Sequence, residues 1–226
     1  MVKLHAAGTA NWDITDGVLA FIARHCSADT VSLETGAGAS TLAFAAAGGA
    51  HTAVTPSVDE AGRIRAAAAE RGIDTSRLTI VNAYSQDVLP GMSGPLDVVL
   101  IDGGHGFPIP AVDWIYTARR LAVGGYMLVD DIDIWTGQML VQFMDKEDEW
   151  ERVEIIRGRT AVFRLVRPFA LREWRHQQAV VQRSRVPRAV RRAKNAAGLL
   201  AKGEFRSILT KLDHDRELAR AAKRKS

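Results

Sequence analysis

The sequence has little cysteine, and it lacks the apolar runs that mark secreted and membrane proteins. Cys26 is the single cysteine among 226 residues, which excludes an internal disulfide framework and a zinc site built from cysteines. The chain does not open with a basic stretch followed by a long apolar run, because Asp13, Asp16 and Arg24 interrupt the apolar residues there. We therefore expect no signal peptide and no membrane span, and a reducing compartment such as the cytoplasm.

Acidic residues are scarce at the C-terminal end of the chain. Residues 167–226 contain 17 Lys/Arg and 5 Asp/Glu, whereas residues 1–166 contain 13 Lys/Arg and 21 Asp/Glu. This opposed charge divides the chain into a predicted domain at 1–166 and a basic helical extension at 167–226. Aromatic residues are also few in the extension, where Trp174 and Phe205 are too sparse for a nucleic-acid stacking platform.

The basic extension has a pattern of its own. Residues 183–194 are densely basic, and after Pro187 the apolar residues recur at helical spacing. These apolar residues are Val190, Ala193, Ala197, Leu200 and Ala201. An amphipathic basic helix of this kind suits contact with an anionic membrane, with nucleic acid such as RNA, or with the acidic face of a partner subunit in a homo-oligomer. A solvated helical tail without a partner is the alternative.

Up to residue 165, segments with strand character alternate with segments with helix character. This alternation predicts an α/β fold with a doubly wound, mostly parallel sheet of Rossmann-like type, whose ligands bind outside the carboxyl ends of the strands. The pair 150–156 and 160–165, joined at Arg157–Arg159, predicts a closing antiparallel hairpin. The other predicted strands are 30–34, 51–55, 78–81, 96–102 and 126–129, and the predicted helices are 15–26, 40–47, 59–71, 112–121 and 137–144.

Residues 31–40 form a turn suited to an adenosine-bearing ligand. A strand-like run ends in Glu34 and passes into a turn with glycines at 36 and 38, followed by the start of a helix near Ser40. A dinucleotide fingerprint would have a third glycine where this chain has Thr41, and its acidic residue would lie far downstream. The order E-x-G-x-G-x-S resembles instead the first motif of class I S-adenosylmethionine-dependent methyltransferases.

The resemblance implies S-adenosylmethionine as cofactor, with Glu34 serving its methionine end and residues 83–85 its adenine. The implied cofactor residues are Glu34, Thr35, Gly36, Ala37, Gly38, Ser40, Thr55, Ala83, Tyr84, Ser85 and Asp102. The chain departs from the family after the second strand, where an acid usually binds the ribose and Thr55 stands here. A threonine can make only one bond to a ribose hydroxyl, unless Asp59 reaches back to help.

Three carboxylates, those of Asp102, Asp130 and Asp131, follow two neighbouring predicted strands. Oxygen ligands in this arrangement suit a hard divalent cation such as Mg²⁺ or Mn²⁺. The layout is similar to that of the metal-dependent, sugar-modifying O-methyltransferases of the macrocin type. The stretches IDGGHGFP and DDIDIW, within a resemblance that covers residues 28–165, also look like those of bacterial class I methyltransferases. The alternative is structural, since strand-end aspartates often cap helices or bind loop N–H groups.

His105 is the candidate catalytic base, together with Asp102. Glycines flank His105, and an imidazole titrates near the pH at which a general base is useful. Orienting a loop is the structural alternative for His105. Asp113 and Asp133 are expected to be structural, and Trp114 and Trp135 are expected in the core or in pocket walls.

The combined prediction is a methyltransferase that acts on a hydroxyl of a small molecule or glycan, with metal assistance left open. Two rivals come from other classes of protein. One is a noncatalytic protein that binds an adenosyl ligand, which an intact set of Glu34, Asp102 and His105 argues against. The other is an RNA-directed methyltransferase or RNA-binding protein targeted by the basic extension, which the acidic charge of residues 1–166 disfavours because it repels phosphate.

Overall fold

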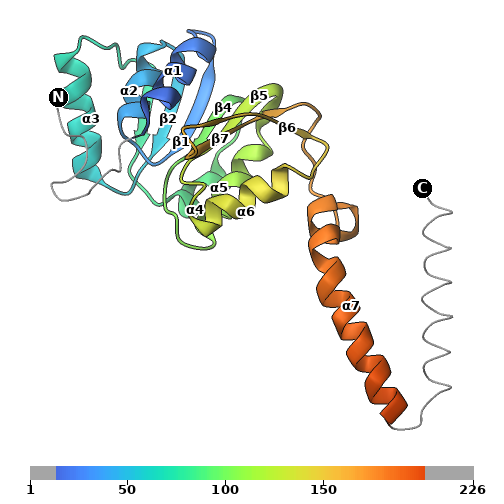
Figure 1. Ribbon diagram of the computed structural model, residues 1–226. Helices are drawn as coiled ribbons and strands as arrows, with labels where there is room; N and C mark the ends of the chain where they lie inside the picture. The colour runs from blue at the N-terminus through green and yellow to red at the C-terminus, as the bar shows by residue number, and fades with distance from the viewer. Residues whose placement is uncertain (1–13, 202–226) are drawn as a thin grey trace. The chain divides into compact units, whose positions relative to one another are not determined.

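A computed structural model describes residues 14–201 and divides the chain into two compact units, Met1–Arg172 and Glu173–Ser226. The described part of the first unit is a seven-stranded sheet with helices on both faces (Figure 1). This confirms the predicted fold class. The first unit continues to Arg172, whereas the charge pattern places the domain boundary at residue 166; the boundary stays a prediction.

The sheet has the strand order β3-β2-β1-β4-β5-β7-β6. The first five strands are parallel, and β7 pairs antiparallel with both β5 and β6. The chain order reverses between β1 and β4, which is where a ligand crevice opens in such sheets. The strands are β1 (Val31–Thr35), β2 (Ala50–Val54), β3 (Leu78–Val81), β4 (Leu96–Ile101), β5 (Leu121–Val129), β6 (Trp150–Ile156) and β7 (Thr160–Leu165).

Two groups of helices cover the sheet (Figure 1). The first group is α1 (Asp16–His25), α2 (Ala39–Ala46) and α3 (Val58–Glu70), and the second is α4 (Ser85–Val88), α5 (Ile109–Ala118) and α6 (Trp135–Met144). A short 3-10 turn (Leu89–Gly91) follows α4. Each predicted helix lies within three residues of its observed bounds, whereas β5 begins five residues before the strand predicted at 126–129. The short α4 was not predicted, because four residues carry too little periodicity to be recognised.

Strand β4 shows how the sequence builds two cores. Its apolar run is continuous because both of its faces are covered by helices. Val98 and Leu100 are buried in a cluster with Phe21 and Phe44 of the first helix group, whereas the alternate residues Val99 and Ile101 are buried in a cluster with residues of α5 and α6. Packing on both faces therefore holds the end of β4 in place, and with it the start of the loop that follows.

The hairpin of β6 and β7 matches its predicted bounds. Arg157 and Gly158 both have positive φ angles, 49° and 70°, which suits a tight hairpin turn between right-twisted strands. Because β7 lies beside β5, the hairpin carries Arg159 and Thr160 to the end of β5.

The segment after β7 is anchored to the first unit by charge and by aromatic packing. Arg172 contacts two buried carboxylates, with Nη2 at 2.9 Å from Glu147 Oε2 and 2.8 Å from Glu149 Oε1. Phe169 packs edge-on against Trp114, with ring centroids 5.2 Å apart. These contacts explain why the first unit continues beyond the last strand.

The second unit is described from its start to Ala201. A 3-10 turn (Trp174–His176) precedes the long helix α7 (Gln178–Ala201), and the guanidinium of Arg188 lies 4.9 Å from the Trp174 ring centroid. The expectation of a helix beginning after Pro187 is wrong, since α7 starts earlier and continues through Pro187. Among the described residues, no helix combines the length and apolar character that crossing a membrane requires.

Candidate active site

Two loops meet at the reversal point of the sheet. Gly36, directly after β1, has φ +91°, and a Cβ added there would lie 2.2 Å from the carbonyl oxygen of Asp102, directly after β4. The Asp102 N–H donates to the carbonyl of Thr35 at 3.0 Å, and the Gly36 N–H donates to the carbonyl of Val54 at 2.9 Å. The two loops are thus in direct backbone contact, which only glycine at position 36 permits.

Glu34 lies inside the protein beneath the glycine turn. Only 1% of it is exposed, and its Oε1 accepts hydrogen bonds from Thr41 and pairs with His51 Nε2 at 3.2 Å. Thr41 Oγ1 in turn accepts from the Gly38 N–H at 2.9 Å. Thr41, which replaces the third glycine of a dinucleotide motif, therefore couples Glu34 to the turn and to the start of α2.

His51 was missed by sequence reasoning. It is buried on β2, with Nδ1 at 2.8 Å from Ser32 Oγ and its ring stacked on Phe44 at a centroid distance of 4.3 Å. A lone histidine in a predicted strand gives no signal of such a role, because its partner Glu34 lies on a different strand.

The predicted ribose residue has an acidic partner after all, but that partner is Glu60 and not Asp59. Thr55 is 2% exposed, and its hydroxyl donates to Glu60 Oε2 at 2.8 Å. The Glu60 N–H donates to Ser57 Oγ, which caps α3 and fixes the first turn of that helix. Asp59 is exposed. A carboxylate therefore stands at the end of β2, supplied by the helix rather than by the strand.

The predicted adenine residues follow β3 and lie beside the same edge. The Ala83 N–H donates to the carbonyl of Thr55 at 3.1 Å, which joins the loops after β2 and β3. Tyr84 is 60% exposed, and Ser85 is buried at the start of α4. Together with Thr35, Gly36, Ala37, Gly38 and Ser40, these residues lie in consecutive strand-end loops, as predicted from the parallel topology.

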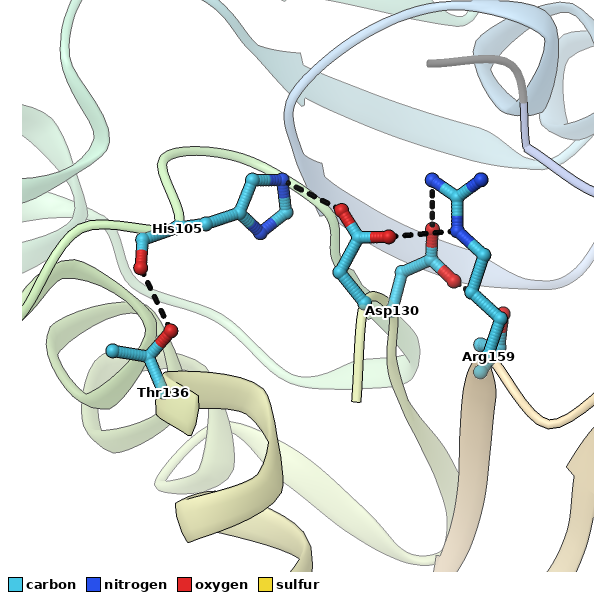
Figure 2. A network of polar contacts seen from close by, with 6 residues as sticks. His105, Asp130, Thr136 and Arg159 are labelled. Carbon is cyan, nitrogen blue, oxygen red and sulfur yellow. Dashed lines mark hydrogen bonds and ion pairs between the residues drawn. The ribbon is translucent and has the colours of Figure 1, made fainter. Parts of the chain in front are cut away.

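Figure 2 shows His105, in the loop after β4, facing the polar side chains that follow β5 and the hairpin residue Arg159. His105 Nε2 lies 3.1 Å from Asp131 Oδ2, and Arg159 Nε donates to Asp131 Oδ1 at 2.7 Å. The Thr136 hydroxyl at the start of α6 donates to the carbonyl of His105 at 2.7 Å. The imidazole is thus fixed by its ring and by its backbone, with about a third of the side chain exposed to solvent.

Asp131 has an unusual backbone. Its φ of 51° is in the left-handed region, and its carbonyl accepts from the Ile134 N–H at 2.9 Å. A Cβ added at Gly137 would lie 2.7 Å from that carbonyl, so α6 approaches the turn closely. Non-glycine residues in this sparsely populated backbone region cluster at functional sites, where the surrounding structure maintains them.

The sequence groups Asp130 with the metal ligands, but the structure turns it elsewhere. Asp130 is 2% exposed, Thr160 donates to its Oδ1, and Arg159 Nη2 lies 3.3 Å from its Oδ2. Burial raises the pKa of Asp130, and Thr160 and Arg159 only partly offset that rise. Among the described residues, the candidate ligand atoms that converge within 4.8 Å of one another belong to Asp102, His105 and Asp131, and a ligand role for Asp130 stays a prediction.

Asp102 lies in a strongly acidic environment. Burial raises the pKa of Asp102 well above its usual value, and the negative charges of Asp130, Glu34 and Asp131 raise it further, in that order, while Arg159 opposes them. A positively charged ligand group, whether a sulfonium or a metal ion, would relieve this repulsion. The site therefore favours cations.

A divalent cation fits the converging group of Asp102, His105 and Asp131 by geometry and charge. Two carboxylates and one imidazole suit Mn²⁺ or a similar transition metal better than Mg²⁺, which prefers oxygen ligands. Arg159 already supplies one positive charge to Asp130 and Asp131, so part of the repulsion is neutralised by the protein itself.

Two exposed aromatic rings lie next to this centre in sequence and space. Phe107 and Trp135 are 67% and 62% exposed, with ring centroids 6.0 Å apart. Trp135 precedes Thr136, whose bond to His105 ties α6 to the loop, so it fits the predicted pocket-wall position. Trp114 and Asp113 instead belong to the core, and burial raises the pKa of Asp113 despite the nearby Ser85 and Thr35 hydroxyls.

Part of the sequence matches a known protein family, and solved structures share the fold. Residues 33–132 match the family described as "Methyltransferase domain". No curated protein matches the sequence.

Three solved structures share the fold. A cofactor-bound structure of Rv0187 from MTB has 18% identity, covers 71% of this chain and 84% of its own, and has a TM-score of 0.60. A protein from Klebsiella pneumoniae described as a "putative O-methyltransferase" has 17% identity, coverage of 72% and 86%, and a TM-score of 0.58. The O-methyltransferase TomG from Streptomyces achromogenes, solved with S-adenosylmethionine, has 15% identity, coverage of 69% and 82%, and a TM-score of 0.56.

Proposed function

We propose that this chain is a class I S-adenosylmethionine-dependent methyltransferase that transfers the methyl group to a hydroxyl of a small molecule or glycan. The match of residues 33–132 to a methyltransferase domain and the shared fold support this proposal. The observation that carries the proposal is the His105–Asp131 pair. It stands at the ends of β4 and β5, beside the glycine turn at the reversal point of the sheet. A noncatalytic adenosyl-binding protein would have no need to maintain it.

The cofactor supplies a methyl group that is already activated on a positively charged sulfur. The protein must therefore hold the acceptor oxygen in line with that methyl group and receive its proton. Because Asp131 engages Nε2 of His105, Nδ1 is the ring nitrogen left to accept the proton. The new oxygen–carbon bond forms as the carbon–sulfur bond breaks, and the proton passes from the hydroxyl to Nδ1.

Asp131 and Arg159 support this transfer by charge. Protonated His105 carries a positive charge, which the adjacent Asp131 carboxylate stabilises, and Arg159 holds that carboxylate in place through its second oxygen. If a divalent cation is bound, Asp102, His105 and Asp131 would hold it. His105 would then be a metal ligand instead of the base, and the cation would lower the pKa of the acceptor hydroxyl in its place.

The decisive test separates cofactor binding from turnover. S-Adenosylhomocysteine should bind in calorimetry, and NAD should not. His105→Ala should keep that affinity while slowing methyl transfer about 10²–10⁴-fold, the usual contribution of a general base. Because the acceptor is unknown, transfer is measured with labelled cofactor against a panel of phenols, glycosides and RNA. NAD binding without S-adenosylhomocysteine binding would refute the proposal, as would labelling confined to RNA.

Metal assistance has its own test, with a readout independent of activity. Mn²⁺ is titrated into protein saturated with S-adenosylhomocysteine, and Asp131→Asn is compared with Asp130→Asn. We expect the first variant to lose Mn²⁺ binding and the second to retain it, because only Asp131 belongs to the converging group. Equal loss in both variants would restore the trio predicted from the sequence, and no Mn²⁺ binding by the parent protein would remove the metal.

A further inference from the structure

Helix α7 carries charge of one sign only. Its 24 residues include six Lys/Arg and no Asp/Glu, although the first unit of the chain is acidic. The basic residues are Arg183, Arg185, Arg188, Arg191, Arg192 and Lys194. Like charges at this density repel one another, and an anionic surface against the helix would lower that repulsion.

The same helix has an apolar stripe. Val186, Ala189, Val190, Ala193 and Ala197 recur at spacings of three and four residues, so they share one face. The two valines on this stripe are exposed, Val186 by 70% and Val190 by 48%. Arg185 and Arg192 lie to one side of the stripe, and Arg183 and Lys194 lie to the other, at about 100° per residue.

We propose that α7 is a membrane-surface helix that binds anionic lipid, lying in the plane of the interface. Its apolar stripe enters the boundary between headgroups and acyl chains, and its flanking cations contact lipid phosphates. This function is additional to methyl transfer and does not depend on it.

An anionic lipid surface can contact both the apolar stripe and the cations that flank it, whereas RNA would contact only the cations. RNA would contact the cations but leave the exposed valines in water, and the Trp174 ring that could stack on a base is already covered by Arg188 and Arg175. The stripe consists of valine and alanine, which provide little apolar area. Electrostatic attraction therefore contributes most of the binding, and we expect strong salt dependence.

The test uses the full chain loaded with S-adenosylhomocysteine and sedimented with vesicles. Vesicles of phosphatidylcholine alone are compared with vesicles that also contain phosphatidylglycerol, at low and high salt. We expect binding only with phosphatidylglycerol, and weaker binding at high salt. Reversal of one cation on each side of the stripe, Arg185→Glu with Lys194→Glu, should lower partitioning more than about 100-fold.

Two further variants separate lipid binding from general attraction to anions. Val186→Asn with Val190→Asn keeps every charge and should lower partitioning about tenfold, because it removes apolar insertion. Arg65→Glu with Arg71→Glu makes the same charge change at exposed positions on and beside α3, and it should leave partitioning nearly unchanged. All variants should bind S-adenosylhomocysteine normally.

Three results would overturn the proposal. Equal binding to both kinds of vesicle, or no binding to either, contradicts a lipid-binding helix. If the α3 charge reversal lowers binding as much as the α7 charge reversal does, the vesicles attract the chain through its net charge alone. Tighter binding to single-stranded RNA than to vesicles, unaffected by the valine changes, assigns the helix to RNA instead.

Discussion

Replacement of Gly36 by alanine should disable cofactor binding through the backbone, without removing any functional group. The φ of +91° is costly for alanine, and the added Cβ would lie 2.2 Å from the Asp102 carbonyl oxygen and 2.9 Å from its carbon. These atoms are backbone, so the loop after β4 must shift. Left-handed strain of about 1–2 kcal/mol and overpacking of about 1–3 kcal/mol give a destabilisation of about 3 kcal/mol. For a chain of this size, that lowers the melting temperature by about 6–12 °C.

The assay combines thermal unfolding with calorimetric titration of S-adenosylhomocysteine. Because the Gly36 turn and the Asp102 loop border the same crevice, we expect the affinity to fall at least about 30-fold. Gly62→Ala is the matched control: nothing lies within 4 Å of its added Cβ on α3, so it should stabilise the helix by up to about 1 kcal/mol. An affinity for Gly36→Ala within about threefold of the parent would refute the reasoning, because the two loops could then separate without consequence.

Three further predictions concern other parts of the first unit. Arg172→Met should cost about 2 kcal/mol in urea unfolding, because it removes a partly exposed arginine from two buried carboxylates, whereas Arg167→Met, an exposed position, should cost at most about 0.5 kcal/mol. Equal costs would contradict the anchoring role. The raised pKa of buried Asp113 means that stability falls as pH rises from the unfolded-state pKa through the folded-state pKa. Asp113→Asn should therefore gain melting temperature relative to the parent as pH rises from acid to neutral, and a constant difference would refute this. Glu34→Ala should weaken S-adenosylhomocysteine binding in calorimetry, because it releases Thr41 from the glycine turn; unchanged affinity would limit Glu34 to a packing role.

Features that depend on neighbouring residues were predictable from the sequence. The run Leu96–Ile101 is long and apolar because the strand is buried on both faces, and its pattern predicts its bounds. The Gly36 turn was predictable for a similar reason, since the turn conformation demands glycine within a short motif. The corresponding strand-end loops then follow from the parallel topology.

Features that depend on distant partners were not predictable. Asp130 and Asp131 are adjacent and chemically identical in the sequence, and Arg159 contacts both, yet Thr160 donates to Asp130 whereas His105 pairs with Asp131. Nothing near Asp130 in the sequence indicates this, because Thr160 comes from the closing hairpin. Glu34 likewise pairs with His51 through strand pairing, and Glu60 reaches Thr55 only because the first turn of α3 is capped.

The prediction that a helix begins after Pro187 was wrong for a different reason. Proline is unfavourable inside a helix because it removes a donor and crowds the preceding turn, so the sequence predicts a start there. The structure continues the helix through it. Pro187 therefore makes the helix less favourable at this position, but it does not end the helix.

Position 131 is subject to two separate constraints, one from its left-handed backbone conformation and one from the role of its side chain in turnover. Only glycine, asparagine and aspartate adopt that conformation cheaply, so a saturation library sorted for folded protein alone should retain these three residues. A library sorted for turnover should retain aspartate alone. Residues that survive the first selection but not the second would be those that the backbone tolerates and the reaction does not. The comparison therefore separates the structural requirement at position 131 from the catalytic one.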